Sequence, residues 1–134
     1  MALLLPALVA LRPTVANAAS PGITVLQSTA QNGFPTGLTF SLQASSSSTI
    51  TAVRLNYRVG DDPVISVADA QFVPAAMVHA SYQIDLSREY YPPGVTVHYR
   101  WQIEDQSGAK LVTNWADLSI TDLRFNWHSQ TQGP

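Results

Sequence analysis

A chain of 134 residues, of which 46% are apolar and only 12% are charged, has the composition of one folded domain and is too short for two. Its net charge of −2 and the lack of a basic cluster exclude an electrostatic basis for binding nucleic acid or an anionic membrane surface. Without cysteine, the chain can have no disulfide, thiolate nucleophile, cysteine zinc site or iron–sulfur cluster.

Residues 1–18 are predicted to be a signal peptide. Residues 2–11 form an apolar run too short to span a bilayer, and Ala16-Asn17-Ala18 matches the small-x-small pattern of a cleavage site. No Lys or Arg precedes the run, so an uncleaved anchor or a buried segment is the alternative. The expected product is exported, secreted or held at the cell surface, with no other membrane span.

The remainder of the chain reads as about seven short strands separated by turn residues. Apolar and polar residues alternate along most of these segments, which is typical of half-buried antiparallel strands. A polar turn is expected at residues 45–48, a loop at 31–37 and a hairpin turn at 104–109. The expected strands are residues 23–27, 38–43, 53–59, 64–67, 78–84, 95–103 and 110–121, the last interrupted around Asn114-Trp115-Ala116.

These strands predict an all-β fold, an immunoglobulin- or fibronectin-III-like sandwich at residues 19–122, with a C-terminal tail or linker at 123–134. Trp101 lies in the middle of the clearest strand and is expected at the centre of the core. The residues expected to point inward are Leu38, Phe40, Leu42, Val53, Leu55, Tyr57, Val78, Tyr82, Ile84, Val97, Tyr99, Trp101, Ile103, Leu118 and Ile120.

No metal site, cofactor site or catalytic motif is predicted. The histidines, His79, His98 and His128, lack the helical spacing of a zinc-peptidase motif, and the two on strands are expected to be simply exposed. There is no Gly-x-Ser-x-Gly nucleophile elbow and no glycine-rich phosphate loop. An enzyme in its own right is the weakest of the interpretations.

Two pairs of acidic residues, Asp61-Asp62 and Glu104-Asp105, occur where turns are predicted. A calcium site would need several oxygens from one concave loop. Aspartate also caps turns through its own side chain, and this ordinary turn role is the favoured interpretation.

Aromatic residues outside the strands are the candidate binding residues. Tyr91 and Trp115 could form a flat platform for a ligand, or fill the ends of the sandwich as core. Phe125 and Trp127 follow the last predicted strand, and are candidates for docking a following domain or for covering the sandwich.

Several short motifs follow one another along the chain. They are residues 33–42 (Gly-Phe-Pro-Thr-Gly-Leu-Thr-Phe-Ser-Leu), 53–60 (Val-Arg-Leu-Asn-Tyr-Arg-Val-Gly), 91–94 (Tyr-Pro-Pro-Gly), 99–101 (Tyr-Arg-Trp), Asp105-x-x-Gly108 and Asp122-x-Arg124-Phe125-x-Trp127. Taken together and in order, these motifs resemble the N-terminal β-sandwich region of exported bacterial peptidase-MA-like metallohydrolases, which are gluzincin zinc peptidases. The Pro-Pro-Gly turn before a Tyr-rich strand also resembles fibronectin type III modules more loosely.

The resemblance implies a non-catalytic accessory domain of a zinc peptidase-like protein, whose catalytic domain is absent from this chain. No catalytic residue can be transferred, because the sequence contains no His-Glu-x-x-His. The implied partner is a downstream catalytic domain. The alternative is a free-standing extracellular module that binds a glycan or a protein at the cell envelope.

Overall fold

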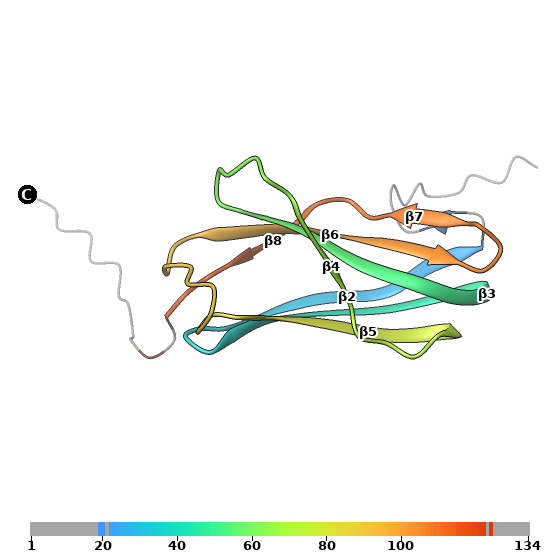
Figure 1. Cartoon of the computed structure of the whole chain (residues 1–134), viewed down its shortest axis with the longest axis horizontal. Helices are drawn as coiled ribbons and strands as arrows, with labels where there is room; N and C mark the ends of the chain where they lie inside the picture. The colour runs from blue at the N-terminus through green and yellow to red at the C-terminus, as the bar shows by residue number, and fades with distance from the viewer. Residues whose placement is uncertain (1–18, 21, 123, 125–134) are drawn as a thin grey trace, which may run out of the picture.

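β-Strands are the only regular elements among the residues that the structure, a computed structural model, describes: 19–20, 22–122 and 124. They join into one antiparallel sheet of eight strands (Figure 1). The predicted all-β class is therefore confirmed, whereas the immunoglobulin- or fibronectin-III-like assignment stays a prediction. The strands are β1 (Ala19–Ser20), β2 (Ile23–Gly33), β3 (Gly37–Val59), β4 (Ser66–Asp69), β5 (Ala75–Asp85), β6 (Thr96–Asp105), β7 (Lys110–Val112) and β8 (Ala116–Ser119).

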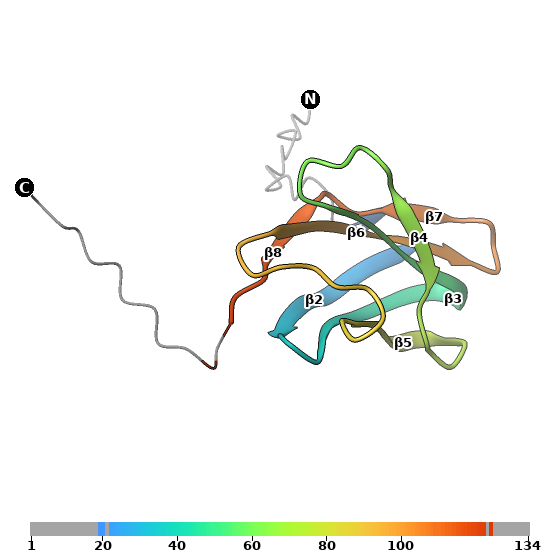
Figure 2. The ribbon, with the colours of Figure 1, turned by 60° about the vertical axis from the view of Figure 1, so that its left-hand side comes forward.

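The 23-residue strand β3 organises the sheet because it takes part in both of its halves. Its first part pairs with β2 over residues 37–46 and with β5 over residues 37–45 and again at Ile50. Its last part, residues 50–59, pairs with β4 and β6. The pairing register shifts between Ser45 and Ile50, where the strand passes from one half to the other. The sheet thus curls, so that a β5 half (β2, β3, β5) faces a β6 half (β4, β3, β6, β7, β8) in Figures 1 and 2.

The polar turn expected at residues 45–48 is wrong, because β3 continues through all four serines. In a turn, water would solvate these serines; here, hydrogen bonds to other protein groups take its place. The Ser46 hydroxyl donates to Oδ2 of Asp105 at 2.6 Å, and the Ser47 amide donates to the Gly22 carbonyl at 3.1 Å. The expected loop at 31–37 is likewise shorter, since β2 continues to Gly33.

Alternation along the strands places the core between the two halves. All of the predicted inward residues are buried except Tyr82 and Leu118, which are half-buried against the same core. Trp101 is 0% exposed, and its indole N–H donates to the Ser28 hydroxyl at 3.1 Å. Core residues that the pattern missed are Ile23, Phe34, Ala44, Ile50, Ala70, Ala80, Leu86 and Leu111.

The two chain ends bear on several of the predictions. The proposed signal peptide, the docking residues Phe125 and Trp127, and His128 all lie outside the described residues. Near the C-terminal end of the described residues, the buried Asp122 accepts hydrogen bonds from the Arg124 amide and guanidinium at 2.8–3.0 Å. Within the described part of the chain, no helix has the length and apolar character needed to cross a membrane.

Candidate functional site

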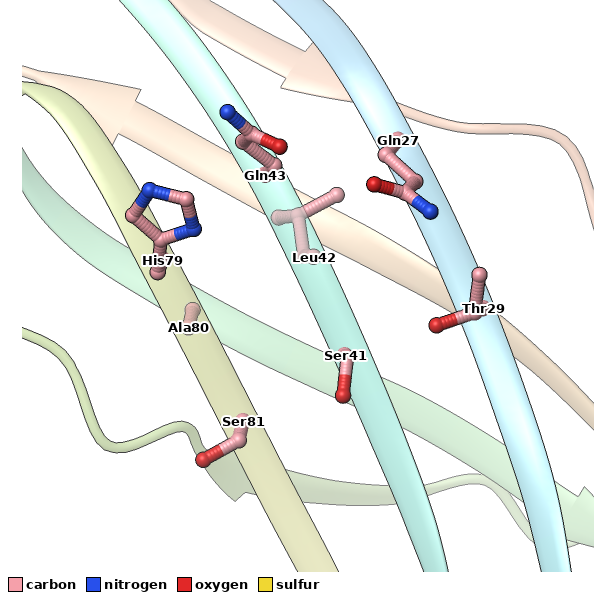
Figure 3. Close-up of a pocket in the computed structure, with 8 residues that line it drawn as sticks. All are labelled: Gln27, Thr29, Ser41, Leu42, Gln43, His79, Ala80 and Ser81. Atoms are coloured by element: carbon pink, nitrogen blue, oxygen red, sulfur yellow. The ribbon is translucent and has the colours of Figure 1, made fainter.

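The outer surface of the β5 half carries a flat array of uncharged polar side chains, which we call the polar face. Alternation turns these side chains away from the core on three neighbouring strands, and strand register aligns them in two rows. Figure 3 shows both rows beside one hollow of about 290 Å³, which the buried Leu42 and Ala80 also line. The rows of the polar face are Gln27–Gln43–His79 and Thr29–Ser41–Ser81.

A second hollow adjoins the first at Ser81 and extends the polar face toward the edge of β5. It measures about 370 Å³, and its walls include Thr39 and Gln83, with Asp69 from the end of β4 and Gln71 from the segment that leads from β4 to β5. The two hollows together form an elongated polar surface. Its only carboxylate, Asp69, lies at one border and already contacts Nε of Arg54 at 3.3 Å.

The polar face has spare hydrogen-bonding capacity. Amide and hydroxyl side chains can each donate and accept, and a neutral histidine can do both through its two ring nitrogens. The side chains of Gln27, Thr29, Ser41, His79 and Ser81 make no hydrogen bond to another described residue, while Gln43 has only a 4.0 Å contact with the sulfur of Met77. These groups are free to bind a ligand rich in hydroxyl groups.

Trp115, one of the two predicted platform residues, lies between β7 and β8 on the outer surface of the β6 half. It is 38% exposed, but its ring is not bare. The guanidinium carbon of Arg100 lies 4.5 Å from the ring centroid, and that of Arg58 lies 5.8 Å away. Trp115 therefore acts together with two cations, and its role as a ligand platform stays a prediction.

Tyr91, the other predicted platform residue, is half-buried in the connection between β5 and β6. Its hydroxyl donates to the Glu89 carboxylate at 2.7 Å, and burial followed by this hydrogen bond raises the pKa of Tyr91 above the usual tyrosine value. No ring contact joins Tyr91 to Trp115 among the described residues. The role of Tyr91 as a ligand platform, like that of Trp115, therefore stays a prediction.

His98 and Asp62 have ordinary protein partners. His98 contacts Asp117 at 2.6 Å on the β6 half, whereas His79 lies on the polar face of the β5 half, and β5 does not pair with β6. Asp62 accepts a hydrogen bond from the Val64 amide at 3.0 Å, as expected of a turn residue. The described ranges contain no group of three or more His, Cys, Asp or Glu that could hold a metal ion.

Comparison with known proteins places the chain in no family. No family model matches it, and no curated protein does. Among solved structures it is similar to the Br derivative of BhCBM56, a carbohydrate-binding module, with 11% identity and a TM-score of 0.48, over 75% of this chain and 95% of that chain. No residue of this chain receives a role from that likeness.

The polar face is not among the sites predicted from the sequence. Its signal was nevertheless available, because the outward positions of the strands at 38–43 and 78–84 carry no charge. The arginines beside Trp115 were also missed, since their meeting depends on strand register and on the path of residues 113–116, which the sequence pattern does not give.

Proposed function

We propose that this protein is a non-catalytic module that binds a neutral glycan along its polar face, on an exported β-sandwich scaffold of the kind expected from the sequence. The observation that carries the proposal is the uncharged, hollowed array formed by Gln27, Thr29, Ser41, Gln43, His79 and Ser81. Sugars present rows of hydroxyl groups that both donate and accept, and amide and hydroxyl side chains complement them in both directions. An uncharged surface also suits a neutral ligand, because no ion must be desolvated on binding.

An elongated site favours a polymer over a single sugar. The two hollows adjoin at Ser81, so successive sugars of one chain can contact the rows one after the other. The accessory role beside a zinc peptidase, implied by the resemblance, stays a prediction, since Phe125 and Trp127 lie outside the described residues.

The proposal is tested by retention on neutral polysaccharides, for example affinity electrophoresis through gels that contain β-glucan, xylan or glucomannan. Replacing a hydrogen-bonding side chain should weaken binding by about threefold to tenfold. Gln27→Ala and Gln43→Ala are therefore expected to reduce retention singly, and further when combined. Gln102→Ala is the matched control, because Gln102 is an outward amide on the opposite half of the sheet.

Retention of the wild type on at least one neutral polymer, lost in the Gln27/Gln43 variants and kept in Gln102→Ala, supports the proposal. Equal retention of all variants contradicts binding along the polar face. No retention on any neutral polymer contradicts the proposed function itself.

A further inference from the structure

A second polar cluster lies on the opposite side of the molecule from the polar face. It consists of Trp115, Arg58, Arg100 and Asn56, and we call it the arginine cluster. Arg58 and Asn56 extend from β3, Arg100 from β6, and Trp115 lies in the connection between β7 and β8. Both guanidinium groups lie against the same indole ring, so two positive charges gather there in a chain with a net charge of −2.

The ion-paired carboxylates on the strands of this half have other partners. Asp69 and Glu104 both contact Arg54, at 3.3 and 3.8 Å, and Asp117 contacts His98 at 2.6 Å. Neither Arg58 nor Arg100 has an ion pair with any described residue. The arginine cluster therefore carries positive charge without a negative partner.

Hydrogen-bond donors are also in excess at the arginine cluster. Asn56 is 5% exposed, and its Nδ2 atom has no hydrogen-bond acceptor. Nε of Arg100 is buried and likewise has none. Strand register sets Asn56 directly opposite Arg100, so the two unsatisfied donors lie on neighbouring strands of one face. Buried donors without acceptors are rare in native proteins, and they point to an acceptor that the protein chain does not supply.

Both guanidinium carbons lie over the Trp115 ring, and this position bears on what that acceptor can be. A guanidinium held over an indole by a cation–π contact still has N–H groups that can donate hydrogen bonds. These N–H groups form a fork that matches the paired oxygens of a carboxylate or sulfate. The indole restricts the motion of the guanidinium groups, and this reduces the entropy lost when an anion binds.

We propose that the arginine cluster is a binding site for the oxyanion of an acidic glycan, either the carboxylate of a uronic acid or a sulfate ester. The choice of a glycan rests on the proposed function, whereas the choice of an oxyanion rests on the geometry of the cluster. Because the cluster and the polar face lie on opposite halves of the sheet, the acidic and the neutral glycan occupy separate sites.

The test measures binding of polygalacturonate, which carries carboxylates, and of chondroitin sulfate, which also carries sulfates, by calorimetric titration at low and at physiological salt. Loss of a charge-assisted hydrogen bond weakens binding by about tenfold or more. Arg58→Gln and Arg100→Gln, singly and combined, should produce such a loss. Arg88→Gln removes the same charge at an exposed site that contacts only Asp85, and should leave affinity unchanged.

Two further variants test the planar fork of Arg100 and the position of the ligand beside Trp115. Arg100→Lys keeps the charge without the planar fork, and it should lose most of the contribution that Arg100 makes to the affinity for acidic glycans. Trp115→Phe should abolish any change in tryptophan fluorescence that binding causes, while circular dichroism shows that each variant remains folded. A carboxylate site should bind both polymers, whereas binding of chondroitin sulfate alone identifies the sulfate as the group bound.

Four outcomes overturn the inference. The first two are that neither acidic glycan binds, and that Arg88→Gln weakens binding as much as Arg58→Gln or Arg100→Gln does. The third is that the Arg58/Arg100 double variant binds with the affinity of the wild type. The fourth is that polyglutamate binds equally tightly, which would indicate a site for acidic polymers in general. Failure of the proposed function would be seen in a different experiment, the retention of the wild type and of the Gln27 and Gln43 variants on neutral polysaccharides. If the arginine variants still bind neutral glycans but no longer bind acidic ones, the result supports both the proposed function and the oxyanion site.

Discussion

Asp105 shows how a single residue can join a turn to a distant strand. Its Oδ1 accepts hydrogen bonds from the Ser107 hydroxyl at 2.6 Å and from the amides of Ser107 and Ala109 at 2.9 and 3.0 Å. Its Oδ2 accepts from the Ser46 hydroxyl on β3 at 2.6 Å. The bonds from Ser107 and then Ser46 favour the carboxylate and hold the pKa of Asp105 below its usual range.

This lowered pKa predicts a pH-dependent stability difference between the wild type and Asp105→Asn. The unfolded chain has an ordinary aspartate pKa of about 3.9, so the carboxylate stabilises the fold above that pH and ceases to do so as the pH falls through the folded pKa. The melting temperature of Asp105→Asn should therefore be lower than that of the wild type at neutral pH. Thermal melts followed by circular dichroism between neutral pH and pH of about 2 should show the gap closing in acid. A gap of constant size would contradict the role of the charge.

At the scale of elements, β6 and β3 explain what sequence patterns can and cannot give. β6 alternates strictly between buried and half-exposed positions because one of its faces packs on the core along its whole length. β3 changes halves midway, so its serines at 45–48 read as a turn although they form a strand. Local polarity predicts solvent contact, whereas here Asp105 and Gly22 supply the partners from distant positions in the sequence.

The same distinction applies to the candidate sites. The polar face follows from alternation, because Ser41, Gln43, His79 and Ser81 lie at outward positions of strands that the sequence predicts. The arginine cluster could not be predicted, because it requires the register that sets Asn56 opposite Arg100. Register depends on long-range pairing, which no local pattern contains.

The buried face of β6 predicts a large effect for Trp101→Ala. Trp101 is fully buried and its indole N–H is bonded to Ser28, so truncation leaves a cavity and removes the bond. The expected loss is about 3–5 kcal/mol of the free energy of unfolding. Urea denaturation measures it.

Trp115→Ala is the control for that measurement, since it removes the same side chain from a partly exposed site. Its expected cost is about 1 kcal/mol or less. Equal effects of the two substitutions would contradict the assignment of Trp101 to the centre of the core.

Across the whole molecule, buried and half-buried tyrosines are expected to limit stability in alkali. Burial is the main cause that raises the pKa of Tyr57, Tyr91 and Tyr99, and hydrogen bonding to Glu89 adds to it at Tyr91. The unfolded chain has ordinary tyrosine pKa values of about 10. Between that pH and the folded pKa values, the folded state holds more protons than the unfolded state, so stability falls as the pH rises.

The melting temperature should therefore be level at neutral to mildly alkaline pH and fall above a pH of about 10. Tyrosinate absorbance should rise in the same pH range in which circular dichroism reports unfolding. Tyr91→Phe should make the alkaline fall less steep, whereas Tyr90→Phe, at an exposed residue, should leave the curve unchanged. A melting temperature that stays constant into strong alkali would refute the role of the buried hydroxyls.

The length of β3 also has a mechanical meaning. Ser41 and Gln43 on the polar face and Asn56 and Arg58 in the arginine cluster belong to one uninterrupted stretch of backbone. If each face holds a polymer, tension between the two polymers passes along covalent bonds instead of across a packed interface between separate sheets. Yielding would then require β3 to be sheared from the strands that flank it, β2 and β5 in one half, β4 and β6 in the other. The molecule would then be a stiff cross-link between the two bound polymers.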